Sequence, residues 1–214
     1  MALIKSAEEI ETLREGGRIL AQILQTLVSK VAPGVSTWDL EVAARDEIGR
    51  AGAEASFLGY TPPWNKKSFP AALCTSINNE VVHCVPSKQR VLKSGEIISL
   101  DSGLKYKNLY TDAGITVPVG SISHEVENLL AGTKEALYAG IEEIKPSNTI
   151  GDVASAIQTV GKKFGLGVIR DLIGHGVGHS IHEPPSVPNY GRPGTLEKLR
   201  PGMFARCTVR RYEK

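Results

Sequence analysis

Three of the five histidines of the chain lie within eight residues, in the stretch GHGVGHSIHEPPSVPNYG that runs from Gly174 to Gly191. His175 stands between two glycines, so the backbone can pass close to a ligand without obstruction by a Cβ atom. His179 and His182 follow it four and seven residues later. Imidazole binds metals and transfers protons near neutral pH, so the stretch is a candidate metal or hydrolytic site. A glycine-rich turn that merely contains histidines is the structural alternative.

Two aspartates are the candidate partners of these histidines. Asp101 follows the apolar run EIISL, and Asp112 lies eleven residues later, beyond a turn. Across a hairpin, two such residues can face each other with Cβ atoms about 5 Å apart, and carboxylates that close repel unless a cation or proton lies between them. A carboxylate can bridge two metals, and oxygen ligands with one imidazole suit manganese, iron, cobalt or zinc. Two unrelated polar residues at strand ends are the alternative.

The other histidines have different surroundings. His83 ends the predicted strand EVVHC and is a further candidate. His124 begins a predicted helix near its N-cap, and we interpret it as structural. His179 fits either a functional or a structural role.

The composition limits the class of protein. The 214 residues are 41% hydrophobic and 22% charged, as in ordinary soluble globular proteins. A net charge of +2 gives no electrostatic reason to bind nucleic acid or an anionic membrane. Cys74, Cys84 and Cys207 are odd in number and widely spaced, which favours a reducing cytoplasm over a disulfide framework. The first residues do not resemble a signal peptide, and no apolar run approaches the ~20 residues that span a bilayer.

Helical spacing predicts two helix pairs. The first helix follows a capping box at Ser6 and Glu9 and ends before Pro33-Gly34, and the second runs from Thr37 towards Gly52. The pattern returns from His124 to Ile144 and in the segment after it. Four residues recur at an offset of 113: Pro33, Asp39, Leu40 and Ala43 match Pro146, Asp152, Val153 and Ala156.

The intervening segments are predicted to be strands. AALCTSI and EVVHCVP are joined at Asn78-Asn79, and GEIISLDSGLKYKNLYTDAGITVPVG gives two strands around Lys107-Asn108. The loop GYTPPWNKKSFP precedes them. With the repeat, this order predicts two α/β halves, related by a pseudo-twofold axis, that share one sheet. A site between the halves would take carboxylates from the first and histidine from the second.

The segments SINNEVVHCVP, LDSGLKYKNLYTDAGIT and GHGVGHSIHEPPSVPNYG with LRPGM resemble type I methionine aminopeptidases. They occur in that family's order and roughly at its spacing, from the first helix to about Met203. The resemblance implies an α+β pita-bread fold in one domain over residues 1–214, with helices backing a curved antiparallel sheet. It also implies removal of the initiator methionine from nascent polypeptides, by a cytoplasmic monomer that can act at the ribosome, with up to two divalent metal ions.

The resemblance implies roles for five polar residues. Asp101, Asp112 and His175 would bind metal, with Asp112 bridging two ions. His83 would contact the substrate or the transition state, and His182 would hydrogen-bond the scissile amide. Water activated by the metals would attack the first peptide carbonyl.

The same resemblance implies a small pocket for the methionine side chain. Cys74, Tyr60 and Phe69 fall where the family has pocket residues, and a thiol with aromatic edges suits a thioether. A buried small residue without a substrate role is the alternative for Cys74.

The chain departs from the family in two places. The family has two further glutamate ligands after RPGM, whereas FARCTVRRYEK here contains only Glu213, and Glu183 and Glu197 are poor substitutes. We therefore expect a polypeptide of these 214 residues to bind divalent metal weakly and to hydrolyse Met-Ala-Ser poorly or not at all. Cys84 stands where the family usually has glycine, and its side chain would either crowd His83 or itself bind metal.

Two other functions are open at this point. A proline-specific or creatine-type hydrolase would share the fold, but such proteins usually carry a large extra N-terminal domain. A non-catalytic module that lost its metals and binds peptides would explain the missing glutamates. The joint presence of Asp101, Asp112, His175, His83 and His182 argues against that module.

Overall fold

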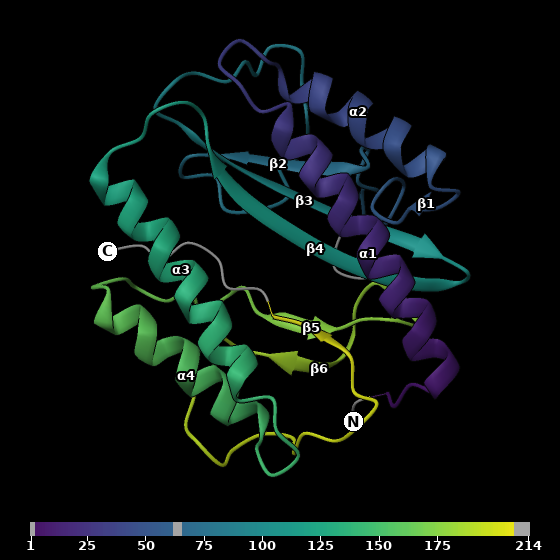
Figure 1. Ribbon diagram of the computed structural model, residues 1–214, viewed down its shortest axis with the longest axis vertical. Helices are drawn as coiled ribbons and strands as arrows, with labels where there is room; N and C mark the ends of the chain where they lie inside the picture. The colour runs from purple at the N-terminus through teal and green to yellow at the C-terminus, as the bar shows by residue number, and fades with distance from the viewer. Residues whose placement is uncertain (1–2, 62–65, 208–214) are drawn as a thin grey trace. The chain divides into compact units, whose positions relative to one another are not determined.

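The computed structural model describes residues 3–61 and 66–207 (Figure 1). These residues form two compact units, one of residues 8–122 and the other of residues 3–7 together with 123–207. Each unit combines a helix pair with an antiparallel sheet. None of the described helices has the length and apolar character that crossing a membrane requires.

The first helix pair is formed by α1 (Ala7–Ser29) and α2 (Thr37–Arg50). α1 begins directly after the predicted cap Ser6, and its buried residues recur at helical spacing: Leu13, Leu20, Ile23, Leu24 and Leu27. α2 begins at a capping box, in which the Asp39 amide donates to Ser36 Oγ at 3.2 Å and the Ser36 amide donates to the Asp39 carboxylate at 3.0 Å. Both helix starts agree with the sequence prediction.

The sheet of this unit is built around its longest hairpin. β3 (Ile97–Tyr106) pairs antiparallel with β1 (Glu54–Ala55), β2 (Leu73–Ile77) and β4 (Leu109–Pro118). Lys107 and Asn108 have φ values of 46° and 67°, which suits the two-residue turn that joins twisted strands. The predicted hairpin is therefore confirmed.

The core of this unit lies between its helices and one face of the sheet, which Figure 1 shows as α1 and α2 beside β2, β3 and β4. Leu20, Leu27 and Leu40 from the helices pack with Leu73 and Leu100 from the strands, and all five are buried. Because strand side chains alternate, the opposite face is presented by residues such as Asp101.

The prediction of a strand over EVVHCVP is wrong, because the chain leaves the sheet at Asn78. That residue has a φ of 50°, and its amide donates to the Ile97 carbonyl at 3.0 Å. The Glu80 carboxylate accepts the Ile77 amide at 2.7 Å, so a side chain takes the place of a paired strand. Residues 80–86 are irregular and return to β2 through the bond from the Thr75 amide to the Cys84 carbonyl, at 3.0 Å.

The second unit contains α3 (His124–Glu142) and α4 (Ile150–Lys163) with β5 (Gly174–Gly176), β6 (Glu183–Val187) and β7 (Ala205–Arg206). β5 is the central strand and pairs antiparallel with β6 and β7. The core joins the helices to β6 through Ala136, Ile150, Val153, Ile157 and Val187. His124 is the first residue of α3, after the N-cap Ser123, as predicted.

The internal repeat is visible in the helix boundaries. α2 and α4 each have 14 residues, and both ends of α4 lie 113 positions after those of α2. The capping box recurs at the same offset, because the Asp152 carboxylate accepts from the Thr149 amide at 2.7 Å and from its hydroxyl at 2.8 Å. The described strands pair in two sheets, one in each unit, and a ladder joining both halves is not seen among them. The pseudo-twofold relation stays a prediction.

Candidate functional site

Asp101 and Asp112 lie on the same face of the β3–β4 hairpin. Asp101 is paired with Gly114, and Asp112 is paired with Gly103. The aspartates are therefore diagonal neighbours, offset by two positions. Strand geometry places the Cα atoms of such neighbours about 7–8 Å apart. They are not directly opposed, as the sequence had suggested, because the two-residue turn sets a register that pairs each of them with a glycine. Asp101 is only 5% exposed, so its negative charge is largely removed from water.

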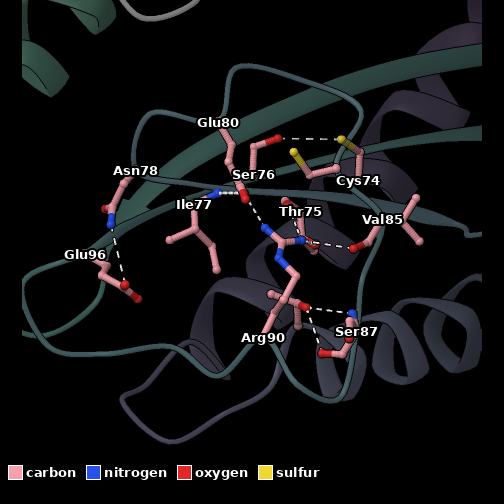
Figure 2. Close-up of polar contacts among 12 residues, drawn as sticks. Cys74, Thr75, Ser76, Ile77, Asn78, Glu80, Val85, Ser87, Arg90 and Glu96 are labelled. Atoms are coloured by element: carbon pink, nitrogen blue, oxygen red, sulfur yellow. Dashed lines mark hydrogen bonds and ion pairs between the residues drawn. The ribbon is translucent and has the colours of Figure 1, made fainter.

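Cys74 is the direct neighbour of Asp101 on this face. The register of β2 against β3 pairs these two residues, and Cys74 is 2% exposed. Its Sγ lies 3.9 Å from the Ser76 hydroxyl (Figure 2). A soft, apolar side chain thus lies next to a buried carboxylate on one sheet face.

Tyr60 and Phe69 are brought together by backbone hydrogen bonds. The Phe69 amide donates to the Tyr60 carbonyl at 2.9 Å, and the Gly59 amide donates to the Phe69 carbonyl at 2.8 Å. This pairing closes the predicted loop between them, of which residues 62–65 lie outside the described part of the chain. Burial raises the pKa of the Tyr60 phenol, so its ring lies in a partly dehydrated environment.

Aromatic packing connects this loop to the carboxylate face. Phe69 packs edge-on against Phe57, with ring centroids 6.5 Å apart. A Cβ atom built on Gly103 would come within 3.0 Å of the Phe57 ring and 2.3 Å of the Ser56 hydroxyl. Only glycine fits at Gly103, beside Asp112 on the ladder. Sequence reasoning missed Ser56, Phe57 and Gly103, and the glycine two residues after Asp101 was the one available signal.

His83 lies in the irregular segment after β2, where it is exposed and has a φ of 59°. A positive φ is uncommon for any residue but glycine and persists where the surroundings enforce it. Figure 2 shows how Arg90 ties this segment to β2. Its Nη1 donates to the Thr75 and Val85 carbonyls, each at 3.0 Å, and its Nη2 pairs with the Glu80 carboxylate. Neither role was predicted: Arg90 lies outside the recognised segments, and Glu80 lies in SINNEVVHCVP but was given no role there.

The start of α2 also anchors the loop that carries His83. The Thr37 hydroxyl donates to the Ser87 carbonyl at 3.1 Å and accepts from the Ser87 amide at 2.9 Å. The side chain of Cys84 donates to the Val82 carbonyl at 3.5 Å. The thiol at this position is thus turned towards its own loop.

The second unit brings His175 and His182 together. His175 lies on β5, and its ring centroid is 4.4 Å from that of His182, with the rings tilted by 54°. His175 Nδ1 lies 2.9 Å from the Gly176 carbonyl oxygen. Only a protonated Nδ1 can donate there, which makes Nε2 the nitrogen suited to a metal. A carbonyl that fixes the tautomer in this way is typical of metal-binding histidines.

Neither glutamate considered as a substitute ligand in this region is well placed for that role. Glu183 accepts the amides of His179 and Ser180 at 3.0 and 3.1 Å, and it forms an ion pair with Lys5. Glu197 forms an ion pair with Arg200 at 3.1 Å. Glu213 lies outside the described residues. The Glu183 carboxylate thus accepts backbone amides of the histidine stretch, which accounts for a glutamate at this position.

The donor set fits a divalent metal in its chemistry. Two carboxylates share one face of β3–β4, and an imidazole with a fixed tautomer lies on β5. Oxygen ligands with one imidazole suit first-row divalent ions. Asp101 and Asp112 belong to one unit and His175 to the other. No group of three or more His, Cys, Asp or Glu side chains is gathered for metal binding within residues 3–61 and 66–207, so their convergence stays a prediction.

Methionine aminopeptidases from other organisms are similar to this chain over most of its length. Methionine aminopeptidase from Aquifex aeolicus is 46% identical over 184 residues, which cover 86% of this chain and 71% of that protein. Methionine aminopeptidase from Clostridium acetobutylicum is 44% identical over 203 residues, which cover 95% of this chain and 79% of that protein.

Crystal structures confirm the pita-bread fold class. Methionine aminopeptidase from Thermotoga maritima matches with a TM-score of 0.91 at 38% identity, covering 96% of this chain and 80% of that one. Xaa-Pro dipeptidase from Bacillus anthracis matches with a TM-score of 0.76 at 23% identity, covering 99% and 58%, which is a likeness of fold alone. Residues 11–213 match metallopeptidase family M24. The chain therefore belongs to metallopeptidase family M24.

Proposed function

We propose that this metalloaminopeptidase removes the N-terminal methionine of polypeptides by hydrolysing their first peptide bond. The observation that carries the proposal is the direct pairing of Cys74 with Asp101 on one sheet face. A buried thiol beside a carboxylate suits a thioether side chain next to a hydrolytic centre. The methionine aminopeptidases that share 46% and 44% of their aligned residues with this chain support the same activity.

Asp101, Asp112 and His175 are the proposed metal ligands, for up to two ions of cobalt, manganese, iron or zinc. When bound, a divalent metal supplies a water of lowered pKa and polarises the peptide carbonyl. The buried position of Asp101 strengthens its attraction for a cation, because a charge in a poorly solvated site is less screened. The Gly176 carbonyl keeps the proton of His175 on Nδ1.

The remaining proposed roles concern the substrate. His182, beside His175, would donate to the peptide amide oxygen or accept from its nitrogen, and His83 would contact the same peptide from its own loop. Cys74, Tyr60 and Phe69 would enclose the methionine side chain. The partly buried Tyr60 ring and the Phe57–Phe69 pair provide apolar surface for this contact.

The cellular setting follows from this reaction. Its substrates would be nascent polypeptides that begin with methionine, met in the cytoplasm and at the ribosome, and the enzyme would act as a monomer. The two units would work as a single metallopeptidase domain. A prolidase-type activity is not favoured, because the matches to Xaa-Pro dipeptidase and prolidase structures are at only 23% and 21% identity. A metal-free binding module is not favoured either, because the relatives at 46% and 44% identity are methionine aminopeptidases.

A peptide panel tests the proposal. The purified chain is incubated with Mn²⁺ and in molar excess over Met-Ala-Ser, Leu-Ala-Ser, acetyl-Met-Ala-Ser or Met-Pro, and release of the first residue is followed by mass spectrometry. We expect methionine from Met-Ala-Ser, loss of that activity with EDTA, and no cleavage of the acetylated peptide. Faster cleavage of Met-Pro than of Met-Ala-Ser would favour the prolidase alternative. Release of leucine from Leu-Ala-Ser as fast as methionine from Met-Ala-Ser, or methionine release that EDTA does not abolish, would refute the proposal.

A further inference from the structure

A buried ion pair links the start of the chain to the histidine stretch. The Lys5 ammonium contacts the Glu183 carboxylate, and their side chains are 0% and 3% exposed. The two residues are 178 positions apart in the sequence. Charged side chains are rarely buried to this extent, because removing two charges from water opposes most of their mutual attraction. Because such a pair need not add net stability, its burial is better explained by a positioning role.

Glu183 organises the turn in front of it. One oxygen of its carboxylate pairs with Lys5, and the other accepts the amides of His179 and Ser180 at 3.0 and 3.1 Å. The turn that the carboxylate closes leads directly into His182. The ring of His182 lies against His175, with centroids 4.4 Å apart.

Lys5 is itself held by backbone contacts. Its amide donates to the Gly202 carbonyl at 2.8 Å, and the neighbouring Ile4 forms an antiparallel bridge with Met203. A Cβ atom on Gly202 would lie 2.7 Å from the Ile4 side chain and 3.0 Å from the Lys5 carbonyl oxygen. Gly202 has a φ of 86°, so glycine permits both the turn and the close approach. These contacts therefore fix the Lys5 backbone, from which the ammonium group reaches Glu183.

We propose that Glu183 is a positioning residue that holds the 178–182 turn, and through it His182, against His175. Lys5 balances the buried negative charge, and the carboxylate holds the two amides of the turn. This inference rests on the proposed function in one respect, since it assumes that His182 contacts the substrate. The effect on the geometry of the turn does not depend on that assumption.

Paired substitutions separate positioning from folding. In K5M/E183Q both charges are absent, but the glutamine oxygen can still accept the amides of His179 and Ser180. In K5M/E183M the side-chain volumes are similar and no acceptor remains. Neutral replacement of a buried ion pair is often tolerated for stability, so we expect both variants to fold. K5M/E183N, whose amide is too short to reach the turn, serves as the second variant without the acceptor if K5M/E183M does not fold.

The exposed ion pair of Lys163 with Glu135 provides a matched control. Its side chains are 70% and 47% exposed and lie 3.0 Å apart, in the same unit. K163M/E135M removes the same charges without touching the turn. This variant should match the unmodified chain in every measurement.

Two readouts test the inference in the full chain. The first is the nuclear Overhauser contact between the His175 and His182 rings, which needs no activity. The second is the single-turnover rate of methionine release from Met-Ala-Ser with Mn²⁺. We expect K5M/E183Q to keep the ring contact and a rate within about threefold of the unmodified chain. We expect K5M/E183M to lose the contact and about 10–100-fold in rate, the range typical of lost outer-shell partners at metal sites.

Each outcome has one meaning. An unchanged ring contact in the folded variant without the acceptor refutes the positioning inference, whatever its rate. Equal losses in K5M/E183Q and K5M/E183M also refute it, because the acceptor would then be irrelevant. H182A tests the proposed substrate role of His182 separately from the positioning inference. A full rate of methionine release in H182A would contradict that role, and the ring contact would still decide on positioning.

Discussion

Replacing Arg90 with alanine should loosen the loop that carries His83. Arg90 donates to the Thr75 and Val85 carbonyls at 3.0 Å each, and such bonds contribute about 1 kcal/mol apiece to stability. Its pairing with Glu80 adds only about 0.5 kcal/mol, because the two side chains are 23% and 38% exposed and water screens the attraction. Water can partly replace the lost donors, so we expect R90A to lower the free energy of unfolding by about 2 kcal/mol.

The assay combines urea denaturation with amide hydrogen exchange. A loss of about 2 kcal/mol corresponds to a fall in Tm of about 4–8 °C for a chain of this size. Exchange should accelerate most at the Thr75 amide, which donates to the Cys84 carbonyl at 3.0 Å across the base of the loop.

R50A is the control for this substitution. Arg50 pairs with Glu47 on the surface of α2, where the side chains are 71% and 26% exposed, and its loss should change stability by less than about 0.5 kcal/mol. If R90A were as mild as R50A and left exchange at Thr75 unchanged, the argument that Arg90 holds the loop would be wrong.

Four further changes test other parts of the structure. C74F should lower kcat/KM for Met-Ala-Ser by an amount equivalent to about 1–3 kcal/mol by filling the proposed pocket, and unchanged kinetics would remove Cys74 from it. G103A should destabilise the fold by about 1–3 kcal/mol in urea denaturation, because its Cβ would meet the Ser56 hydroxyl at 2.3 Å; an unchanged midpoint would contradict this packing. D39N and D152N should lower stability at pH 7, and their effect should shrink as the pH falls below the ordinary Asp pKa of ~4. The hydrogen bonds from Ser36 and Thr149 lower the pKa values of these carboxyls, so their contribution is present above pH ~4 and is lost as the pH falls through the lowered values. Equal destabilisation at pH 7 and at lower pH in thermal denaturation would show that charge is not the cause.

The helices and the long hairpin were predictable because their signals are local. Spacing of apolar residues located α1 and α2, and Lys107-Asn108 marked the turn between β3 and β4. The segment after Asn78 looked like a strand because of its adjacent valines. The Glu80 side chain takes over the Ile77 amide there, a competition that no periodicity reveals.

The site was predictable in its residue types and less so in its geometry. Asp101 and Asp112 share a face as expected, but their diagonal register depends on the exact pairing set by the turn. The contact of Lys5 with Glu183 spans nearly the whole chain, and neither residue belongs to a local pattern that predicts the other. Tertiary packing alone brings such groups together, and only the structure reveals them.

A crystal structure with Mn²⁺ and L-methionine tests the central proposal most directly, since anomalous diffraction locates manganese without relying on activity. We expect manganese bound to the carboxylates of Asp101 and Asp112 and to Nε2 of His175, at about 2.0–2.2 Å. We also expect the methionine side chain to lie against Cys74. Manganese bound elsewhere, or bound to the aspartates with His175 remote from it, would contradict the proposed site.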